Sequence, residues 1–146
     1  MDNKKVNYKV LVITVIAALL GSMGGKYLMD YFGKSKNIID KELMRAAGEI
    51  NKHLPIMVDS ETRLDSTIAL PDKTFQYAYT IINFSKEELN LEELENNLRP
   101  MILNNIKTNS DLKHFRDNKV TMIYSYRDKN NNEVLKLTYA YDDYKE

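Results

Sequence analysis

The sequence predicts an α+β protein: an N-terminal transmembrane helix followed by a small antiparallel four-stranded sheet (α-ββ-α-ββ) with helices on one face. Three observations predict it. An apolar run covers Val10–Met29, the hydrophobic period changes from helical to alternating at Ile56, and a helical pattern separates two alternating hairpin patterns. Amphipathic helices and a one-sided sheet each bury one apolar face, so we expect the helices to cover a single face of the sheet.

The apolar run Val10–Met29 has the length and the flanks of a membrane-spanning helix. A helix of this length spans about 30 Å, the thickness of the hydrocarbon core of a bilayer. Tyr8 lies at one end of the run, and Tyr27 and Tyr31 lie at the other. Amphipathic rings prefer the two membrane interfaces. We therefore predict a single-pass anchor in the lipid bilayer.

Lysines before the run favour a cytoplasmic N-terminus. Lys4, Lys5 and Lys9 precede a full domain, although lysines on the far flank nearly balance the count. We expect the domain outside the cytoplasm, at a cell membrane such as the bacterial inner membrane. The predicted parts are a cytoplasmic N-terminus (1–9), a transmembrane anchor (10–29), a linker (30–37) and an extracytoplasmic α+β domain (38–146).

A cleaved signal peptide is the competing interpretation of the same run. Val10–Leu20 would be its apolar region, and Ser22-Met23-Gly24 would be a small-x-small cleavage site before Gly25. A cleaved peptide has no use for aromatic residues on the far side of the membrane. The aromatic residues therefore favour the retained anchor.

Small residues recur along one face of the predicted anchor. Ala17, Gly21 and Gly25 are spaced four residues apart, and Gly21 to Gly25 satisfies the G-x-x-x-G pattern. Such a face lets two helix backbones approach closely in lipid. It predicts a homodimer through the anchor, although glycine is also common in membrane helices that do not associate.

The predicted domain begins with a helix and a hairpin. Apolar residues recur at helical spacing up to Pro55, with Asn37 as a candidate N-cap. Residues 62–70 and 74–81 then alternate across a turn at Pro71-Asp72-Lys73, with Leu64, Ile68 and Leu70 expected on one side. The helical pattern contains Ile39, Leu43, Ala46, Ile50 and Leu54.

A second helix and a second hairpin complete the pattern. Ser85 with Glu88, and Asn90 with Glu93, have the spacing of helix caps. The helix beyond them contains Pro100, so we expect a kink or two helices in series. A short polar helix or turn at 110–116 precedes strands at 120–126 and 134–141, joined by an asparagine-rich turn.

Composition excludes several functional classes. Lysine plus arginine equals aspartate plus glutamate, 21 against 21, which predicts no nucleic-acid partner. There is no cysteine and there are two histidines, so we predict no thiolate or histidine metal site and no cofactor. Five glutamates between residues 87 and 95 fit the first turns of a helix better than a catalytic cluster, because acidic side chains stabilise that end.

Tyrosines are the one unusual feature of the predicted strands. Tyr77, Tyr79, Tyr124 and Tyr126 alternate along two strands, where they predict a binding surface for a peptide or a glycan. The alternative is a tyrosine-lined core whose hydroxyl groups reach its edge. Neither interpretation involves a catalytic residue.

Short segments of the domain resemble a known group of proteins. The segments are Leu54–Asp59, Thr62–Asp65, Tyr77–Thr80 and Tyr124–Asp128. They resemble a group of small exported bacterial proteins that are distantly like the α/β pilotins of type II secretion. The resemblance implies an exported, non-enzymatic accessory domain. Pilotins carry a lipidated cysteine, which this chain lacks, so its tether would be the predicted helix.

The predicted function follows from placement rather than from a reaction. We predict a membrane-anchored, non-enzymatic accessory or binding protein of the cell envelope, with another envelope protein as its partner. One alternative is an envelope hydrolase or wall-modifying enzyme, which would bring Asp59, Asp65 and a histidine into one pocket. Another is a toxin-neutralising immunity protein.

Overall fold

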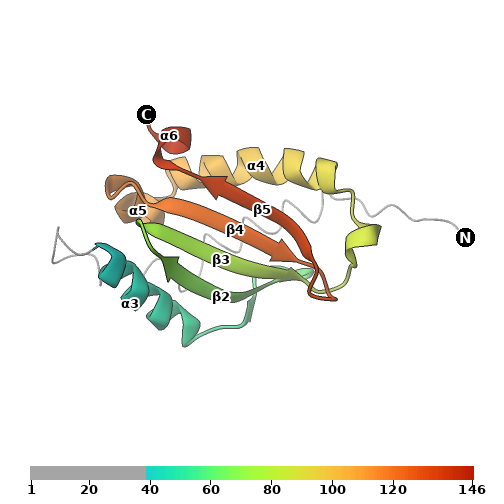
Figure 1. Cartoon of the computed structure of the whole chain (residues 1–146). Coiled ribbons are helices and arrows are strands. Elements are labelled where there is room, and N and C mark those ends of the chain that lie inside the picture. Colours follow the sequence, from blue (N-terminus) through green and yellow to red (C-terminus); the bar gives the residue numbers. More distant parts are fainter. Residues whose placement is uncertain (1–38) are drawn as a thin grey trace, which may run out of the picture.

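The computed structural model describes residues 39–146 (Figure 1). The predicted anchor with its Ala17, Gly21 and Gly25 face, the linker and the Asn37 cap all lie outside the described residues. Between residues 39 and 146, no helix is both long enough and apolar enough to cross a membrane.

Helix α3 (Ile39–Asn51) packs on the sheet through one apolar stripe. Leu43, Ala46, Ala47 and Ile50 are its buried residues. The Asn51 side chain then pairs with the free edge of a strand. Its Oδ1 accepts from the Thr67 amide at 2.7 Å, and its Nδ2 donates to the Thr67 carbonyl at 2.8 Å. A side-chain amide thereby satisfies backbone groups that an edge strand would leave unpaired.

The sheet is five-stranded and mixed, in the order β1-β2-β3-β4-β5, which corrects the predicted four-stranded antiparallel sheet. The two hairpins are antiparallel as predicted, but β3 and β4 pair in parallel. The reason is topological, because the helical connection after β3 returns the chain to the end of the sheet where β3 began. The strands are β1 (Ile56–Met57), β2 (Thr62–Leu70), β3 (Thr74–Ile81), β4 (Thr121–Arg127) and β5 (Glu133–Tyr139).

A bulge in β2 overturns the prediction that Leu64, Ile68 and Leu70 share one face. The register with β3 shifts between Leu64 and Ser66, which leaves Asp65 as the extra residue. An extra residue reverses the alternation beyond it. Leu64 and Thr67 are therefore buried, whereas Ile68 is 49% exposed.

The β2–β3 turn has the backbone that a tight hairpin requires. Leu70 pairs with Thr74, and Asp72 and Lys73 between them both have positive φ, 61° and 54°. Three residues therefore form the loop, and backbone with positive φ is typical of tight hairpin turns whose twist matches that of the strands. The predicted hairpin at 62–81 is therefore confirmed.

Both predicted caps precede the long helix α4 (Leu91–Thr108). The Ser85 amide donates to Glu88 across the short helix η1 (Lys86–Glu88), and Asn90 Oδ1 accepts from the Glu93 amide. Pro100 lies inside α4, which runs as one helix, so of the two expected outcomes the division into two helices is excluded and the kink stays a prediction. Proline removes one backbone donor, but the flanking turns continue.

Short helices occupy the remaining connections. The predicted polar turn is η2 (Ser110–Leu112) followed by α5 (Lys113–Asp117). The last strand ends at Tyr139, earlier than predicted, and Tyr141 begins helix α6 (Tyr141–Tyr144). The Tyr144 hydroxyl donates to the Val120 carbonyl at 2.7 Å, which attaches α6 to the segment before β4.

Helices α3 and α4 lie on the same face of the sheet, as the sequence predicts. Thr67, bound by α3, pairs with Tyr77, which pairs with Tyr124 of β4. Tyr139, whose hydroxyl donates to the Arg99 carbonyl of α4, pairs with Met122, two residues from Tyr124. Side chains two residues apart share a face. The core therefore lies between this face and the two helices.

Candidate functional site

The four tyrosines of the predicted binding surface lie together in the core. Tyr77 pairs with Tyr124 and Tyr79 with Tyr126 in the parallel β3–β4 register. Their rings stack with centroids 5.1 Å and 4.9 Å apart, respectively. We call these four side chains the tyrosine row. None of them is more than 8% exposed.

Two hydroxyl groups of the tyrosine row are buried without a hydrogen-bond partner among the described residues. They belong to Tyr79 and Tyr126, and the Oδ2 atom of Asp59 shares this condition. The other oxygen of Asp59 accepts from the amides of Glu61 and Thr62 at 2.7 Å and 2.8 Å. Three buried polar atoms therefore remain unsatisfied in one domain, where a few per hundred residues is the usual number.

Burial raises the pKa of every tyrosine in the row. For Tyr79 the neighbouring Tyr126, Tyr124 and Tyr77 raise the pKa further. For Tyr126 the additional causes are Tyr139 and the charge of Asp59, which brings the β1–β2 loop near this end of the row. The hydroxyl groups therefore stay protonated and can act as hydrogen-bond donors.

The tyrosine row is not open to a partner while the core is closed. The predicted use of Tyr77, Tyr79, Tyr124 and Tyr126 as a binding surface stays a prediction. It now requires that a covering segment move. Near Asp59, the end of the row formed by Tyr79 and Tyr126 has buried polar atoms that lack a hydrogen-bond partner among the described residues.

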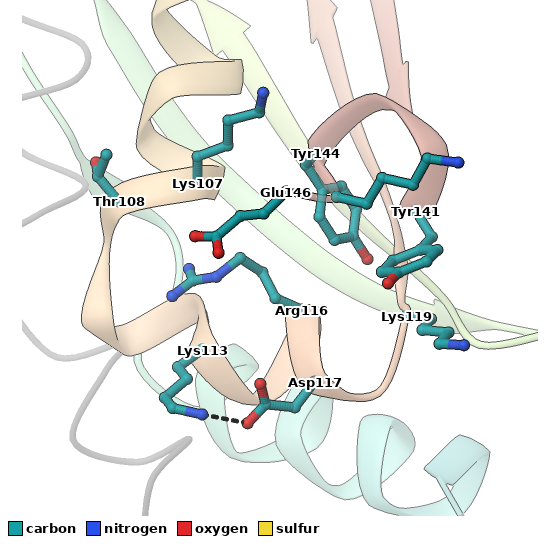
Figure 2. A pocket seen from close by; sticks show the side chains of 10 residues that line it. Lys107, Thr108, Lys113, Arg116, Asp117, Lys119, Tyr141, Tyr144 and Glu146 are labelled. Carbon is teal, nitrogen blue, oxygen red and sulfur yellow. Dashed lines mark hydrogen bonds and ion pairs between the residues drawn. The ribbon is translucent and has the colours of Figure 1, made fainter.

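A second candidate is a basic pocket of about 640 Å³ where α4, α5 and α6 meet (Figure 2). It combines residues 107–119 with residues 141–146, so the complete site is not visible as one stretch of sequence. The excess of lysine and arginine between residues 107 and 119 is the signal that points to it. The pocket is lined by Lys107, Thr108, Lys113, Arg116, Asp117, Lys119, Tyr141, Tyr144, Lys145 and Glu146.

Arg116 is held in place within the basic pocket by main-chain carbonyls. Its Nη1 donates to the carbonyl oxygens of Ile106 and Asn109, each at 2.7 Å, at the end of α4. Lys119 lies over the Tyr141 ring, 5.0 Å from its centroid. A cation above an aromatic face is attracted by the negative face of the ring. Arg116 is therefore a fixed positive charge in the pocket.

The other predicted candidates do not come together. Asp59 caps the β1–β2 loop, while Asp65 binds Arg63 and the Thr80 hydroxyl on the face of the sheet opposite the helices. Among the glutamates at 87–95, Glu88 accepts from the Ser85 amide and Glu95 forms an ion pair with Arg99. Within residues 39–146, no group of three or more histidine, aspartate or glutamate side chains is placed to hold a metal.

Solved structures share this fold at very low sequence identity. A pilotin of the type 2 secretion system from Vibrio vulnificus, EpsS, has a TM-score of 0.58 at 8% identity, covering 74% of this chain and 93% of its own. The type II secretion pilotin AspS from Vibrio cholerae has 0.55 at 10%, covering 72% and 91%. A candidate secreted protein from Pseudomonas aeruginosa has 0.57 at 11%, covering 75% and 98%.

These likenesses confirm the predicted resemblance to exported proteins and pilotins at the level of the fold. No curated protein matches the sequence. A family model described as "Domain of unknown function (DUF8479)" matches residues 37–136, which include all five strands up to the middle of β5. The chain therefore belongs to the DUF8479 family.

Proposed function

We propose that this protein is a single-pass, membrane-anchored accessory protein of the cell envelope that binds another envelope protein and catalyses no reaction. One observation carries the proposal. The described domain has the fold of two pilotins over 93% and 91% of their chains, so it corresponds to nearly the whole of such a protein. Here the predicted helix at 10–29 replaces a lipid as the tether, because the chain has no cysteine.

The proposed contact with the partner is the Tyr79–Tyr126 end of the tyrosine row. A buried polar atom without a partner costs about 1–3 kcal/mol. A donor or acceptor from a bound segment would recover that free energy at Asp59, Tyr79 and Tyr126. The β1–β2 loop is the segment that would move, since β1 contributes only two residues to the sheet.

Separation of the acidic side chains favours binding over hydrolysis. A hydrolase would need Asp59, Asp65 and a histidine to converge. Asp65 is instead engaged by Arg63 and Thr80 on the opposite face of the sheet. Asp59 is engaged by two backbone amides of its own loop.

Site-specific photo-cross-linking in intact cells tests the proposal. A photoreactive residue replaces Ser60, an exposed position of the β1–β2 loop, in the tagged full-length chain. The matched control replaces Lys136, which is exposed on β5. We expect one envelope protein to be captured from position 60, captured less after Tyr79→Phe with Tyr126→Phe, and not captured from position 136.

Two results would contradict the proposal. One is the same capture from both positions, because it would indicate contact without a defined surface. The other is recovery of the protein alone, which would leave self-association through Ala17, Gly21 and Gly25 as the only interaction.

A further inference from the structure

The basic pocket lies at the end of the domain where the chain enters it. At this end the Lys73 amide donates to Asp40 in the first turn of α3, at 2.9 Å. The Thr121 amide donates to the Lys73 carbonyl, also at 2.9 Å, and Lys119 of the pocket lies two residues before Thr121. In Figure 1 the start of α3, α5 and α6 lie together at this end, and η1 lies at the opposite end.

Positive charge is concentrated in the basic pocket although the domain is acidic. Residues 39–146 contain 15 lysines and arginines against 19 aspartates and glutamates, a net charge of −4. The pocket lining instead has five cationic side chains and two carboxylates, Asp117 and Glu146. Lys113 and Lys145 form ion pairs with Asp117 and Asp142, which leaves Lys107, Arg116 and Lys119 as the charges available to an anion. An anionic surface attracts an acidic domain most favourably through an end where cationic side chains are in excess.

Arg116 has the geometry to bind a phosphate group. Both hydrogens of its Nη1 are committed to carbonyls, which fixes the plane of the guanidinium. Among residues 39–146, its Nη2 and Nε have no hydrogen-bond partner, and a planar pair of such donors matches phosphate oxygens. Figure 2 shows Glu146 pointing toward Arg116, so an incoming anion competes with this carboxylate.

The length of the predicted linker favours a membrane as the source of the phosphate group. The predicted linker, residues 30–37, extends at most about 28 Å. The entry end of the domain therefore stays close to the headgroups if the anchor is retained. Tyr141, which is 36% exposed, and Lys119 above its ring add the pairing of aromatic and lysine side chains that suits a membrane interface.

We propose that the basic pocket binds the phosphate group of an anionic phospholipid headgroup and seats the entry end of the domain on the membrane surface. This inference rests on the proposed anchor but not on the proposed protein partner. It leaves the Tyr79–Tyr126 end of the row directed away from the membrane. The two proposed contacts thus lie at opposite ends of the domain.

Fluorescence quenching in nanodiscs tests the lipid contact. The chain has no cysteine, so Thr108→Cys places a single fluorophore at the rim of the pocket, and Asn130→Cys places one at the far end. The full-length protein is reconstituted with headgroup spin-labelled lipid, in phosphatidylcholine alone or with phosphatidylglycerol. We expect strong quenching at position 108 only with phosphatidylglycerol, and little at position 130.

Variants separate the pocket from general electrostatics. Each lysine near an anionic surface contributes a several-fold preference, so Lys107→Gln with Lys119→Gln should lower the quenched fraction about tenfold. Glu146→Gln, which removes the competing carboxylate, should raise it. Lys129→Gln with Lys136→Gln, the matched pair away from the pocket, should leave it unchanged.

Three results would overturn the proposal. Equal quenching in both lipid compositions would exclude an anionic headgroup, and equal loss in both double variants would exclude the pocket. Inorganic phosphate that saturates the pocket and leaves the quenching unchanged at constant ionic strength would identify a site for free phosphate instead. Loss of cross-linking at position 60 with retained quenching would overturn only the proposed protein partner, so the two failures are distinguishable.

Discussion

Tyr79 and Tyr126 carry hydroxyl groups that the closed core does not use. Their rings pack well, at 1% exposure each, but their oxygens and Asp59 Oδ2 find no partner among residues 39–146. A buried polar atom without a partner costs about 1–3 kcal/mol. A bound segment that supplies hydrogen-bond partners for these atoms would offset that cost.

Removal of these hydroxyl groups should separate stability from binding. We expect Tyr79→Phe and Tyr126→Phe to leave the free energy of unfolding unchanged or to raise it by up to about 1 kcal/mol each, because an unsatisfied group is lost. Urea unfolding of the full-length chain in detergent measures this. A loss of more than about 1 kcal/mol would mean that the hydroxyl groups already have partners in the free protein.

Asp128 should make stability depend on pH at the acidic end of the range. Its side chain is buried, which by itself raises the pKa, but hydrogen bonds from Asn132, Lys86 and Asn130 lower it overall. A pKa lowered by folding gives stability that is present above the unfolded value, about 3.9, and is lost as pH falls through the folded value.

The comparison with Asp128→Asn isolates this contribution. We expect the urea midpoint of the wild-type protein to fall more steeply below about pH 4 than that of the variant. Asp117→Asn, at an exposed position of α5, serves as the control and should keep the wild-type slope. Parallel curves for Asp128→Asn and the wild-type protein would contradict the assignment.

At the scale of elements, α3 is a docked part of the domain. Leu43 is fully buried against the sheet, while its neighbour Met44 is 63% exposed. Leu43→Ala should destabilise the domain by about 2–5 kcal/mol, and Met44→Ala should change its stability by less than about 0.5 kcal/mol. Equal effects in urea unfolding would show that α3 does not contribute to the core.

Local signals account for the elements that the sequence predicts correctly. The caps at Ser85 and Asn90 and the turn at Asp72-Lys73 depend on neighbouring residues, so their patterns are readable in one stretch. Strand pairing across α4 is a long-range property, so the parallel contact of β3 with β4 was not predictable. The bulge at Asp65 likewise depends on the partner strand. It puts Ile68 on the face opposite the one that the sequence predicts.

At the scale of the whole molecule, the domain has two chemically different ends. The entry end holds the basic pocket, assembled from residues 107–119 and 141–146, and the far end holds Asp59, Tyr79 and Tyr126. The tyrosines are recognisable in the sequence because they alternate along strands. The pocket is not, because lysines are common on any protein surface and only the fold brings its two distant segments together.

In a membrane-anchored accessory protein, these two ends would contact different partners. An anchor at residues 10–29 would hold the basic end at the bilayer and present the other end to the envelope. Every proposed contact therefore depends on a retained anchor with the domain outside the cytoplasm.

Cysteine accessibility is the most direct test of that claim. Single cysteines replace Asn3 or Asn130 in the cysteine-free chain, and intact spheroplasts are treated with a membrane-impermeant maleimide before or after lysis. We predict that the Asn130→Cys chain reacts before lysis and that the Asn3→Cys chain reacts only afterwards, on a full-length band. Labelling of the Asn3→Cys chain in intact spheroplasts would contradict this orientation. A domain band that carries no label from Asn3→Cys after lysis would show that the N-terminal segment has been removed, which would contradict a retained anchor.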